Sequence, residues 1–313
     1  MSRIVISEFM DTAAIEKLRA DHDVVVDETL CENTDALAET IAEADALIVR
    51  NRTQVTAELI SSATKLKAVG RLGVGLDNID LQACKARDIA VLPAVGANAV
   101  SVAEYVLTTA MMLLRGPVYF RTSDLQNGKW PRPELSKGRE IAGKTMGLVG
   151  FGSIGQTTAN LARAAGFNTI AYDTFLPADH DAWKTTASKS LDELLREAEV
   201  ISLHCPLTPE TTNLIGKDEL AKLKPGTVLI NTARGGIVDE RALANSLRSG
   251  HLGGAAVDVF SSEPIDEATA EVFSDVPNLV LTPHVAGVTA ESNTRISAIT
   301  AENVLRTLRE KQS

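Results

Sequence analysis

Five polar side chains follow apolar, strand-like runs of the sequence, and their types could carry proton and charge chemistry. They are Arg234, Asp258, Glu263, His204 and His284. Ligands of open α/β sheets bind outside the carboxyl ends of the strands, so residues at these ends are candidates for a site. An arginine fork pairs with a carboxylate at two points, and a histidine exchanges protons near neutrality. The set predicts acid–base chemistry on a substrate that carries a carboxylate.

Two histidines compete for the proton exchange on these grounds. His204 follows the run "VISL" and His284 follows "NLVLTP", and their spacing does not choose between them. A satisfied core histidine is the plainer interpretation of each, as a structural ion pair is for Arg234. Glu263 is either an ordinary loop carboxylate or an acid that keeps the correct histidine protonated near neutral pH.

A glycine-rich stretch, "GLVGFGSIGQ", predicts a dinucleotide site. Gly150, Gly152 and Gly155 have the GxGxxG spacing, after a strand-like run and before a helical one. These glycines permit a tight turn, close approach of a pyrophosphate and close packing of helix on strand. Asp173 ends the next predicted strand, where a carboxylate binds ribose hydroxyls and repels a 2′-phosphate. NAD is therefore the expected cofactor, and a packing turn beside a surface aspartate is the alternative.

Short β-branched runs alternate with amphipathic segments along the chain, which is typical of α/β proteins with parallel sheets covered by helices. The first series has expected strands at residues 3–7, 23–27, 46–51, 66–72 and 89–95. The second series suits a doubly wound nucleotide-binding sheet. Its six expected strands are residues 145–151, 168–173, 200–206, 226–233, 253–260 and 278–284.

Helices are expected between most of these strands. Those at 11–21 and 35–44 begin with Asp11 and Asp35, which are good N-cap candidates. The segment 101–115 is apolar around most of its circumference, which predicts a core helix or a subunit contact. The helical segment 291–310 follows the last strand and could cross back to the first series.

The composition fits a globular protein of two domains, with 313 residues of which 44% are hydrophobic. A formal net charge of −10 argues against nucleic-acid and anionic-membrane partners. Cys31, Cys84 and Cys205 lie far apart without metal-ligand spacing, so we expect free thiols, no metal and a cytoplasmic location. The sequence shows neither a signal-peptide pattern nor an apolar run that approaches a membrane span.

Seven motifs, in this order, resemble the D-isomer-specific 2-hydroxyacid dehydrogenases, a family that includes phosphoglycerate, glycerate and D-lactate dehydrogenases. The motifs are "RLGVGLDNID", "NAVSVAEYVL", "GLVGFGSIGQ", "VISLHCPLTPETTNLI", "LINTARGGIVDERAL", "AAVDVFSSEP" and "LTPHVAG". The resemblance covers nearly the whole chain. It implies an NAD-dependent interconversion of a 2-hydroxy acid and its 2-oxo acid.

The resemblance also implies a catalytic triad, in which Arg234 anchors and polarises the 2-oxo acid, His284 exchanges the proton and Glu263 tunes His284. The implied cofactor contacts are Gly150, Gly152, Ser153, Ile154, Gly155, Asp173, Cys205, Thr212, Thr232, Ala233, Arg234, Asp258, His284 and Gly287. The backbone amides of Val74 and Gly75 would hold the substrate carboxylate.

The family fold implies a Rossmann-type NAD domain, residues 100–288, inserted into a flavodoxin-like substrate domain of residues 1–99 and 289–313. Homodimers would form through the NAD domain. Two departures from the family pattern, "AVG" at 94–96 and Tyr105 in place of the usual histidine, fall outside the triad. The chain ends after its last predicted helix, so we expect no regulatory domain.

An NAD-sensing, corepressor-like binding protein of the same fold is the alternative to an enzyme. Corepressors of this fold usually add disordered tails and peptide clefts. An intact triad with no extra segment at either end favours the enzyme, although fold alone does not decide function.

Four arginines are candidates for binding the end of the substrate that is distal to its carboxylate. Arg50 and Arg52 lie in "VRNRTQV", where relatives position the distal end of the substrate, and Arg71 and Arg121 are further candidates. On an acidic protein such a cluster favours a substrate with a second anionic group, although solvated surface arginines are an equal alternative. The hypothesis is a 3-substituted lactate or pyruvate, with sulfolactate, phosphoglycerate and malate as candidates and Arg52 as a substrate contact.

Overall fold

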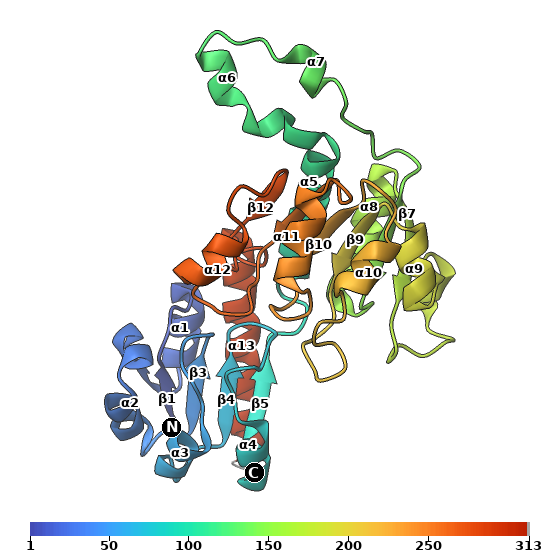
Figure 1. Cartoon of the computed structure of the whole chain (residues 1–313). Helices are drawn as coiled ribbons and strands as arrows, with labels where there is room; N and C mark the ends of the chain where they lie inside the picture. Colours follow the sequence, from blue (N-terminus) through green and yellow to red (C-terminus); the bar gives the residue numbers. More distant parts are fainter. Residues whose placement is uncertain (312–313) are drawn as a thin grey trace. The chain divides into compact units, whose positions relative to one another are not determined.

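The computed structural model describes residues 1–311, which divide into two compact units. The first unit holds residues 1–98 and the chain from Val288 onward, and the second holds Ala99–Gly287. The last two residues of the predicted segment 289–313 lie outside the described residues. Each unit is built on one sheet, and all the strand pairs in both sheets are parallel (Figure 1).

The sheet of the first unit has the order β2-β1-β3-β4-β5, the doubly wound order of flavodoxin-like folds. Its strands are β1 (Arg3–Ile6), β2 (Asp23–Val26), β3 (Ala46–Val49), β4 (Ala68–Arg71) and β5 (Ala90–Pro93). Its helices are α1 (Thr12–Arg19), η1 (Glu28–Glu32), α2 (Thr34–Ile41), α3 (Ala57–Ser62), α4 (Leu81–Ala86) and α13 (Ala290–Glu310). The predicted crossing back of the C-terminal helix is confirmed, because α13 packs on α1 and β4.

Strand β1 shows why this sheet is apolar on both faces. Ile4 and Ile6 join the core beneath α1 and α13, whereas Val5 joins the core beneath α2 and α3. Successive side chains of a strand point to opposite faces, and all three are 0% exposed. A parallel sheet covered on both faces therefore needs a continuous apolar run, which is the pattern in the sequence.

The sheet of the second unit has the order β12-β11-β10-β9-β6-β7-β8. Its strands are β6 (Thr145–Val149), β7 (Asn168–Tyr172), β8 (Ala187–Ser188), β9 (Val200–Leu203), β10 (Val228–Asn231), β11 (Gly254–Val257) and β12 (Leu279–Leu281). The six predicted strands are confirmed, each shorter than expected. The edge strand β8 was not predicted, because two residues are too few to show a period.

Helices cover both faces of this second sheet. The helices of the second unit are α5 (Ala99–Leu114), η2 (Gly116–Phe120), α6 (Thr122–Gln126), α7 (Arg132–Leu135), α8 (Ser153–Ala165), η3 (Asp181–Lys184), α9 (Leu191–Glu197), α10 (Lys217–Lys222), α11 (Glu240–Arg248) and α12 (Glu267–Val272). Helix α5 packs on α8, β10 and β11, with Val102, Val106 and Leu113 buried. This packing supports the core interpretation of the predicted helix 101–115.

One of the two predicted helix caps is wrong. The Asp11 carboxylate accepts the N–H of Ala13 at 3.0 Å and caps α1, as expected. Helix α2 is capped instead by Asn33, whose Oδ1 accepts the N–H of Ala36 at 3.1 Å, while Asp35 lies in the first turn. Both residue types cap helices well, and the end of η1 at Glu32 places Asn33 at the start.

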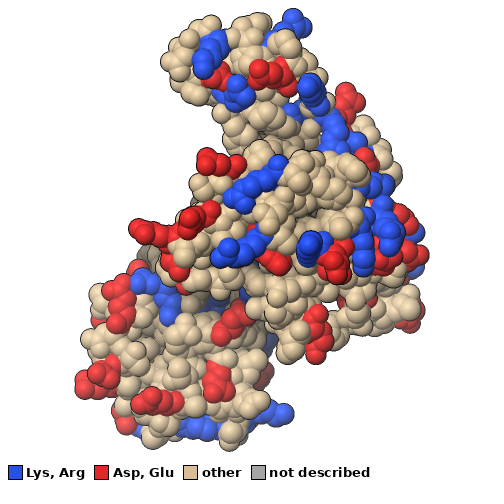
Figure 2. Space-filling model, in the orientation of Figure 1, with Lys and Arg blue, Asp and Glu red and all other residues tan. Residues whose placement is uncertain are grey.

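An extension of the second unit, residues 116–138, follows α5 and carries α6 and α7 (Figure 1). Its apolar side chains are exposed, with Tyr119 at 58%, Leu125 at 50% and Trp130 at 75%. On the face drawn in Figure 2, basic and acidic side chains are interspersed. None of the helices within residues 1–311 has the length and apolar character that a membrane span requires.

Candidate active site

The parallel strands of the second sheet end at one edge, and most of the predicted site residues follow those ends. Gly150 follows β6, Asp173 follows β7, His204 follows β9, Thr232 to Arg234 follow β10, Asp258 follows β11 and His284 lies three residues after β12. The strand order reverses around β6 and β9, which is where doubly wound sheets bind nucleotides.

The glycine-rich loop has the backbone that a dinucleotide requires. Gly150 has φ +92°, and a Cβ there would lie 2.7 Å from the backbone N of Cys205. A Cβ on Gly155 would lie 2.4 Å from the carbonyl oxygen of Gly150. A Cβ on Gly152 would meet nothing within 4 Å, so open space faces the start of α8, which Ser153 and Ile154 form. Free N–H groups at a helix N-terminus favour a phosphate in such a space.

The Asp173 carboxylate ties the glycine-rich loop to the turn after β7. Its Oδ2 accepts the N–H of Phe151 at 2.6 Å, and its Oδ1 accepts those of Phe175 and Leu176, each at 2.8 Å. A carboxylate has about four acceptor positions, so these three contacts leave room for a ribose hydroxyl. The ribose contact of Asp173 stays a prediction, and the turn that would present it is well defined.

The turn after β10 contains an orphaned hydroxyl. Thr232 Oγ1 is buried and has no hydrogen-bond partner among residues 1–311. Asn231 shapes this turn, because its Oδ1 accepts the N–H of Ala233 at 3.1 Å and its Nδ2 donates to the carbonyl of Arg234 at 2.9 Å. A buried hydroxyl that lacks a partner fits a polar group of a cofactor. Asn231 was not predicted, although an amide at the end of a buried apolar strand is a usable signal.

The loop after β9 holds the two remaining predicted cofactor contacts, Cys205 and Thr212. Burial, with a smaller contribution from the negative charge of Asp173, raises the pKa of the Cys205 thiol to about 11. The thiol is therefore protonated at neutral pH. Thr212 donates its hydroxyl hydrogen to the carbonyl of Thr208 at 2.8 Å, within the same loop.

His284 and Glu263, which lie 21 residues apart in the chain, form a direct pair. The distance between His284 Nδ1 and Glu263 Oε2 is 2.7 Å, and Glu263 Oε1 accepts the N–H of Phe260 at 2.9 Å. The side chains of His284 and Glu263 are 43% and 34% exposed, so the pair is open to solvent. The hydrogen bond from the N–H of Phe260 fixes the Glu263 carboxylate. The other ring nitrogen of His284, Nε2, is then the atom that can meet a substrate.

The competing histidine, His204, has a different environment. Its Nε2 lies 2.9 Å from the hydroxyl oxygen of Ser202, and burial lowers the pKa of His204 to about 3. The imidazole is therefore neutral throughout the range in which a histidine normally exchanges protons. This environment favours His284 for proton exchange.

Asp258 closes the loop that carries His284. Its carboxylate accepts the Thr282 hydroxyl at 2.5 Å and the N–H groups of Val285 at 2.8 Å and Ala286 at 2.9 Å. Its carbonyl accepts the N–H of His284 at 2.8 Å. His284 has φ +55°, a conformation that costs about 1 kcal/mol or more for a residue with a Cβ. The predicted cofactor contact of Asp258 stays a prediction, and the structure adds that Asp258 positions the histidine.

Tyr105, a residue of α5, is connected by hydrogen bonds to Asp258. Its hydroxyl lies 2.7 Å from Thr282 Oγ1, and Thr282 in turn donates to Asp258. Burial raises the pKa of the Tyr105 phenol, so the O–H is kept as a donor. The departure at Tyr105 therefore lies two hydrogen bonds from Asp258, which holds the loop of His284. Neither Tyr105 nor Thr282 was among the predicted site residues.

The turn that carries Arg234 packs against the loop that carries Glu263. A Cβ on Gly235 would lie 1.8 Å from the carbonyl oxygen of Phe260, so only glycine permits this approach.

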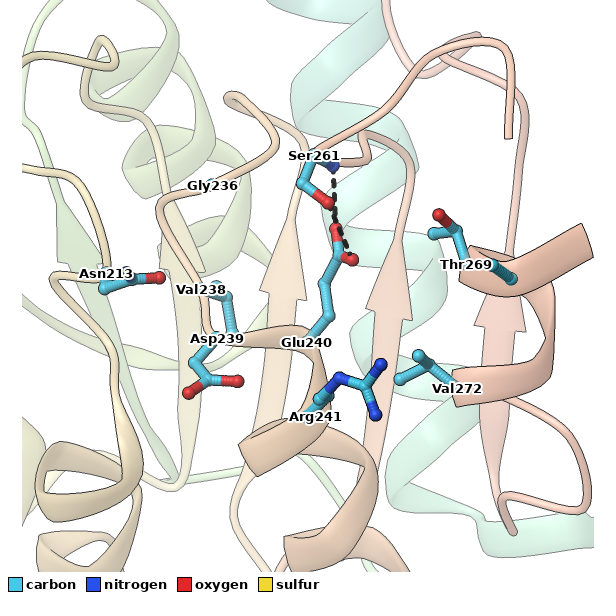
Figure 3. Close-up of a pocket in the computed structure, with 10 residues that line it drawn as sticks. Asn213, Gly236, Val238, Asp239, Glu240, Arg241, Ser261, Thr269 and Val272 are labelled. Atoms are coloured by element: carbon cyan, nitrogen blue, oxygen red, sulfur yellow. Dashed lines mark hydrogen bonds between the residues drawn. The ribbon is translucent and has the colours of Figure 1, made fainter. Parts of the chain in front are cut away.

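Glu240, at the start of α11, accepts the N–H and the hydroxyl of Ser261 at 2.8 and 2.9 Å and so fixes the loop that carries Glu263 (Figure 3). A hollow of about 320 Å³ lies beside this contact, lined by residues of α11 and α12 and of the loop before α11. Arg234 itself donates from Nη1 to the carbonyl of Ala233 at 2.5 Å.

The predicted substrate residues of the first unit lie in two loops. Val74 and Gly75 are in the turn after β4, and Arg50 and Arg52 are in the loop after β3. Arg50 Nη2 donates to Asn293 at 2.8 Å.

The remaining arginine contacts are mostly with acids. Arg52 pairs with Glu32 at the surface, and Arg71 donates to the carbonyl of Leu72 at 2.6 Å. Arg121 lies in the extension of the second unit, where it pairs with Asp124 and with Glu134. Arg50 and Arg52 thus share a loop, whereas Arg121 belongs to a different segment. Both Arg52 and Arg121 are paired with acids.

Within residues 1–311, no group of three or more His, Cys, Asp or Glu side chains is arranged to hold a metal ion. All three cysteines are free thiols, as expected.

Comparison with known proteins gives a consistent result. Residues 107–286 match the model of the D-isomer specific 2-hydroxyacid dehydrogenase NAD binding domain. The chain belongs to this family. Its cofactor is therefore NAD, and it is an oxidoreductase that interconverts a 2-hydroxy acid and the corresponding 2-oxo acid.

Three relatives illustrate the range of similarity. The (S)-sulfolactate dehydrogenase of Chromohalobacter salexigens is 54% identical over 98% of this chain and 99% of its own. The hydroxypyruvate reductase of Thermotoga maritima is 39% identical over 98% of both chains. The solved structure of D-lactate dehydrogenase from Aquifex aeolicus, with NAD and lactic acid, has a TM-score of 0.81 and 27% identity over 99% of this chain and 96% of that one. All three are named as enzymes, which does not favour the corepressor-like alternative.

Proposed function

We propose that this enzyme interconverts a 2-hydroxy acid that bears a second anionic group at C3 and its 2-oxo acid, with sulfolactate and sulfopyruvate as the first candidate pair. The observation that carries the proposal is the 54% identity to an (S)-sulfolactate dehydrogenase along 98% of the chain. The loop with Arg50 and Arg52 supports it, because guanidinium groups recognise sulfonate, phosphate and carboxylate oxygens. Val74, Gly75 and Arg52 are the proposed substrate contacts of the first unit.

The proposed mechanism assigns one task to each triad residue. Arg234 pairs with the substrate carboxylate through its planar fork and polarises the oxygen on C2. In the oxidising direction, the C2 hydroxyl gives its proton to Nε2 of His284, while the C2–H bond breaks. NAD, when held at the glycine-rich loop and Asp173, would supply the hydride acceptor for C2. Glu263 at Nδ1 stabilises the imidazolium that forms, and the reverse direction returns the proton to the new hydroxyl.

A panel of 2-oxo acids, assayed by the loss of NADH absorbance, tests the proposal. We expect sulfopyruvate to be reduced with the highest kcat/KM, ahead of hydroxypyruvate, oxaloacetate and pyruvate. Equal kcat/KM for sulfopyruvate and pyruvate would contradict the second anionic group. Activity on none of these compounds would contradict the proposed substrate class altogether.

We also propose that the enzyme is a cytoplasmic homodimer formed through the second unit. The exposed apolar side chains of the extension, among them Tyr119 and Trp130, support an interface with a second copy, because such patches on soluble proteins mark interaction sites. Three free thiols suit a reducing compartment, and the net charge of −10 does not favour nucleic-acid binding. Light scattering should give twice the mass of the chain, and a monomer mass would contradict the dimer.

A further inference from the structure

A buried carboxylate lies inside the loop that carries Arg50 and Arg52. Glu8 is 5% exposed and follows β1 by two residues. Its Oε1 accepts the N–H groups of Arg50 at 2.8 Å and Thr53 at 3.0 Å, and its Oε2 accepts those of Asn51 at 3.3 Å and Arg52 at 3.1 Å. Four consecutive backbone amides thus point at one side chain. Residues 50–53 are called the arginine loop below.

The opposite side of the arginine loop is held by Asn78. Its Nδ2 donates to the carbonyl of Arg50 at 3.2 Å and to the carbonyl of Thr53 at 2.7 Å. The N–H of Val55 donates to the carbonyl of Asn78 at 2.8 Å. Asn78 lies in the segment that begins with Gly73 and includes Val74 and Gly75, so the two loops proposed to contact substrate are joined by hydrogen bonds within the first unit.

These contacts decide what the arginine loop can offer a ligand. A run of convergent amides is an anion-binding nest, and here Glu8 fills it. The loop therefore presents guanidinium groups rather than its amides. Burial lowers the pKa of Arg50, and the charge of Glu8 opposes that shift. Arg52 is exposed, and only its backbone is held by Glu8.

We propose that Glu8 is a positioning residue for substrate specificity: by holding four amides of the arginine loop, it fixes where Arg50 and Arg52 stand and so sets the preference for a second anionic group. The specificity part rests on the proposed function. The positioning part rests on the hydrogen bonds alone. The two parts therefore need separate measurements.

Hydrogen exchange tests the positioning. In Glu8→Gln, one side-chain oxygen becomes an NH₂ group that cannot accept an N–H, so the amides of residues 50–53 should exchange about tenfold faster than in the wild type. The matched control is Glu16→Gln, which removes an exposed carboxylate paired with Arg19 in the same unit and should leave these amides unchanged. Unchanged exchange in Glu8→Gln would overturn the positioning role.

Kinetics with NADH tests the specificity. Glu8→Gln should raise KM for sulfopyruvate about tenfold more than KM for pyruvate, with kcat for pyruvate and the Kd for NADH unchanged. Asn78→Ala loosens the same loop from its carbonyl side and should change the KM ratio in the same direction, and it decides the matter if Glu8→Gln does not fold. Equal changes in both KM values would overturn the specificity role. If the wild type reduces neither compound, the proposed function fails, and hydrogen exchange still decides whether Glu8 positions the loop.

Discussion

Two loops of this enzyme, one in each unit, are closed on a buried carboxylate. The arginine loop, residues 50–53, gives four amides to the Glu8 carboxylate. The histidine loop, residues 284–286, gives two amides to the Asp258 carboxylate and a third, that of His284, to the Asp258 backbone carbonyl. The two loops differ in whether the functional side chain is fixed as well as the backbone. The ring of His284 is also held, by Glu263, whereas the guanidinium of Arg52 meets only an exposed partner at the surface.

This difference matches the proposed roles of the two loops, proton transfer for the histidine loop and substrate specificity for the arginine loop. A proton must pass between defined atoms, and a small misplacement of a reacting group costs much of the rate. Attraction between a guanidinium and a second anionic group acts over a longer distance and tolerates side-chain movement. Changes to the histidine loop should therefore affect every substrate alike, and changes to the arginine loop should affect only substrates with a second charge.

The largest effect is expected for His284→Gln, which keeps a polar side chain but removes the group that exchanges the proton. We expect kcat to fall by roughly 10²–10⁴-fold for all substrates, the usual contribution of a general acid–base group. The Kd for NADH, measured by fluorescence, should change far less than kcat, because His284 is only one of many implied cofactor contacts. A kcat within threefold of the wild type would remove His284 from the mechanism.

The next effect is expected for Asp258→Asn. The amide retains one acceptor oxygen but turns an NH₂ group toward the N–H of Val285 or Ala286, so the histidine loop should lose its fixed shape. We expect kcat to fall about a hundredfold for all substrates and the free energy of unfolding to fall by about 2–3 kcal/mol. Steady-state kinetics and urea unfolding measure the two quantities. Asp181→Asn, at an exposed aspartate of the same unit, is the control and should change neither.

A smaller effect is expected for Tyr105→Phe, which removes the hydroxyl that contacts Thr282 and leaves the ring in place. The loss of one partly buried hydrogen bond is worth about 1 kcal/mol, so kcat should fall about fivefold for sulfopyruvate and pyruvate equally. Tyr119→Phe, at the exposed extension, serves as the control. A change in the ratio of kcat/KM between the two substrates would show that Tyr105 acts on specificity instead.

The smallest effect on activity is expected for His204→Gln. Because burial lowers the pKa of His204 to about 3, this imidazole does not titrate between pH 5 and 9, and both limbs of the pH–rate profile should stay in place. Stability should respond, however. The unfolded histidine takes up a proton near pH 6.5 while the folded one does not, so the wild type loses stability as the pH falls from 6.5 toward 3. Urea unfolding at pH 7.5 and pH 5 should show a smaller loss in the variant, and an equal loss would contradict the lowered pKa.

Local patterns were sufficient to predict the strands, the glycine-rich loop and the strand-end residues, because apolar runs and turn glycines are short-range signals. The pairing of Glu263 with His284 required the family resemblance, since spacing could not choose between two histidines. Contacts across long separations were beyond the sequence. Tyr105 and Thr282 are 177 positions apart, and nothing near Glu8 marks it as the partner of residues 50–53. Glu8 was not among the predicted site residues, although it follows a buried strand and the strand-end rule could have marked it as a candidate.

The most direct test of the division between the two loops is the ratio of kcat/KM for sulfopyruvate to kcat/KM for pyruvate, measured side by side in the wild type, Asp258→Asn and Glu8→Gln. We expect Asp258→Asn to lower both values and keep the wild-type ratio, and Glu8→Gln to lower the ratio about tenfold. A ratio that changes in Asp258→Asn and stays constant in Glu8→Gln would contradict the account.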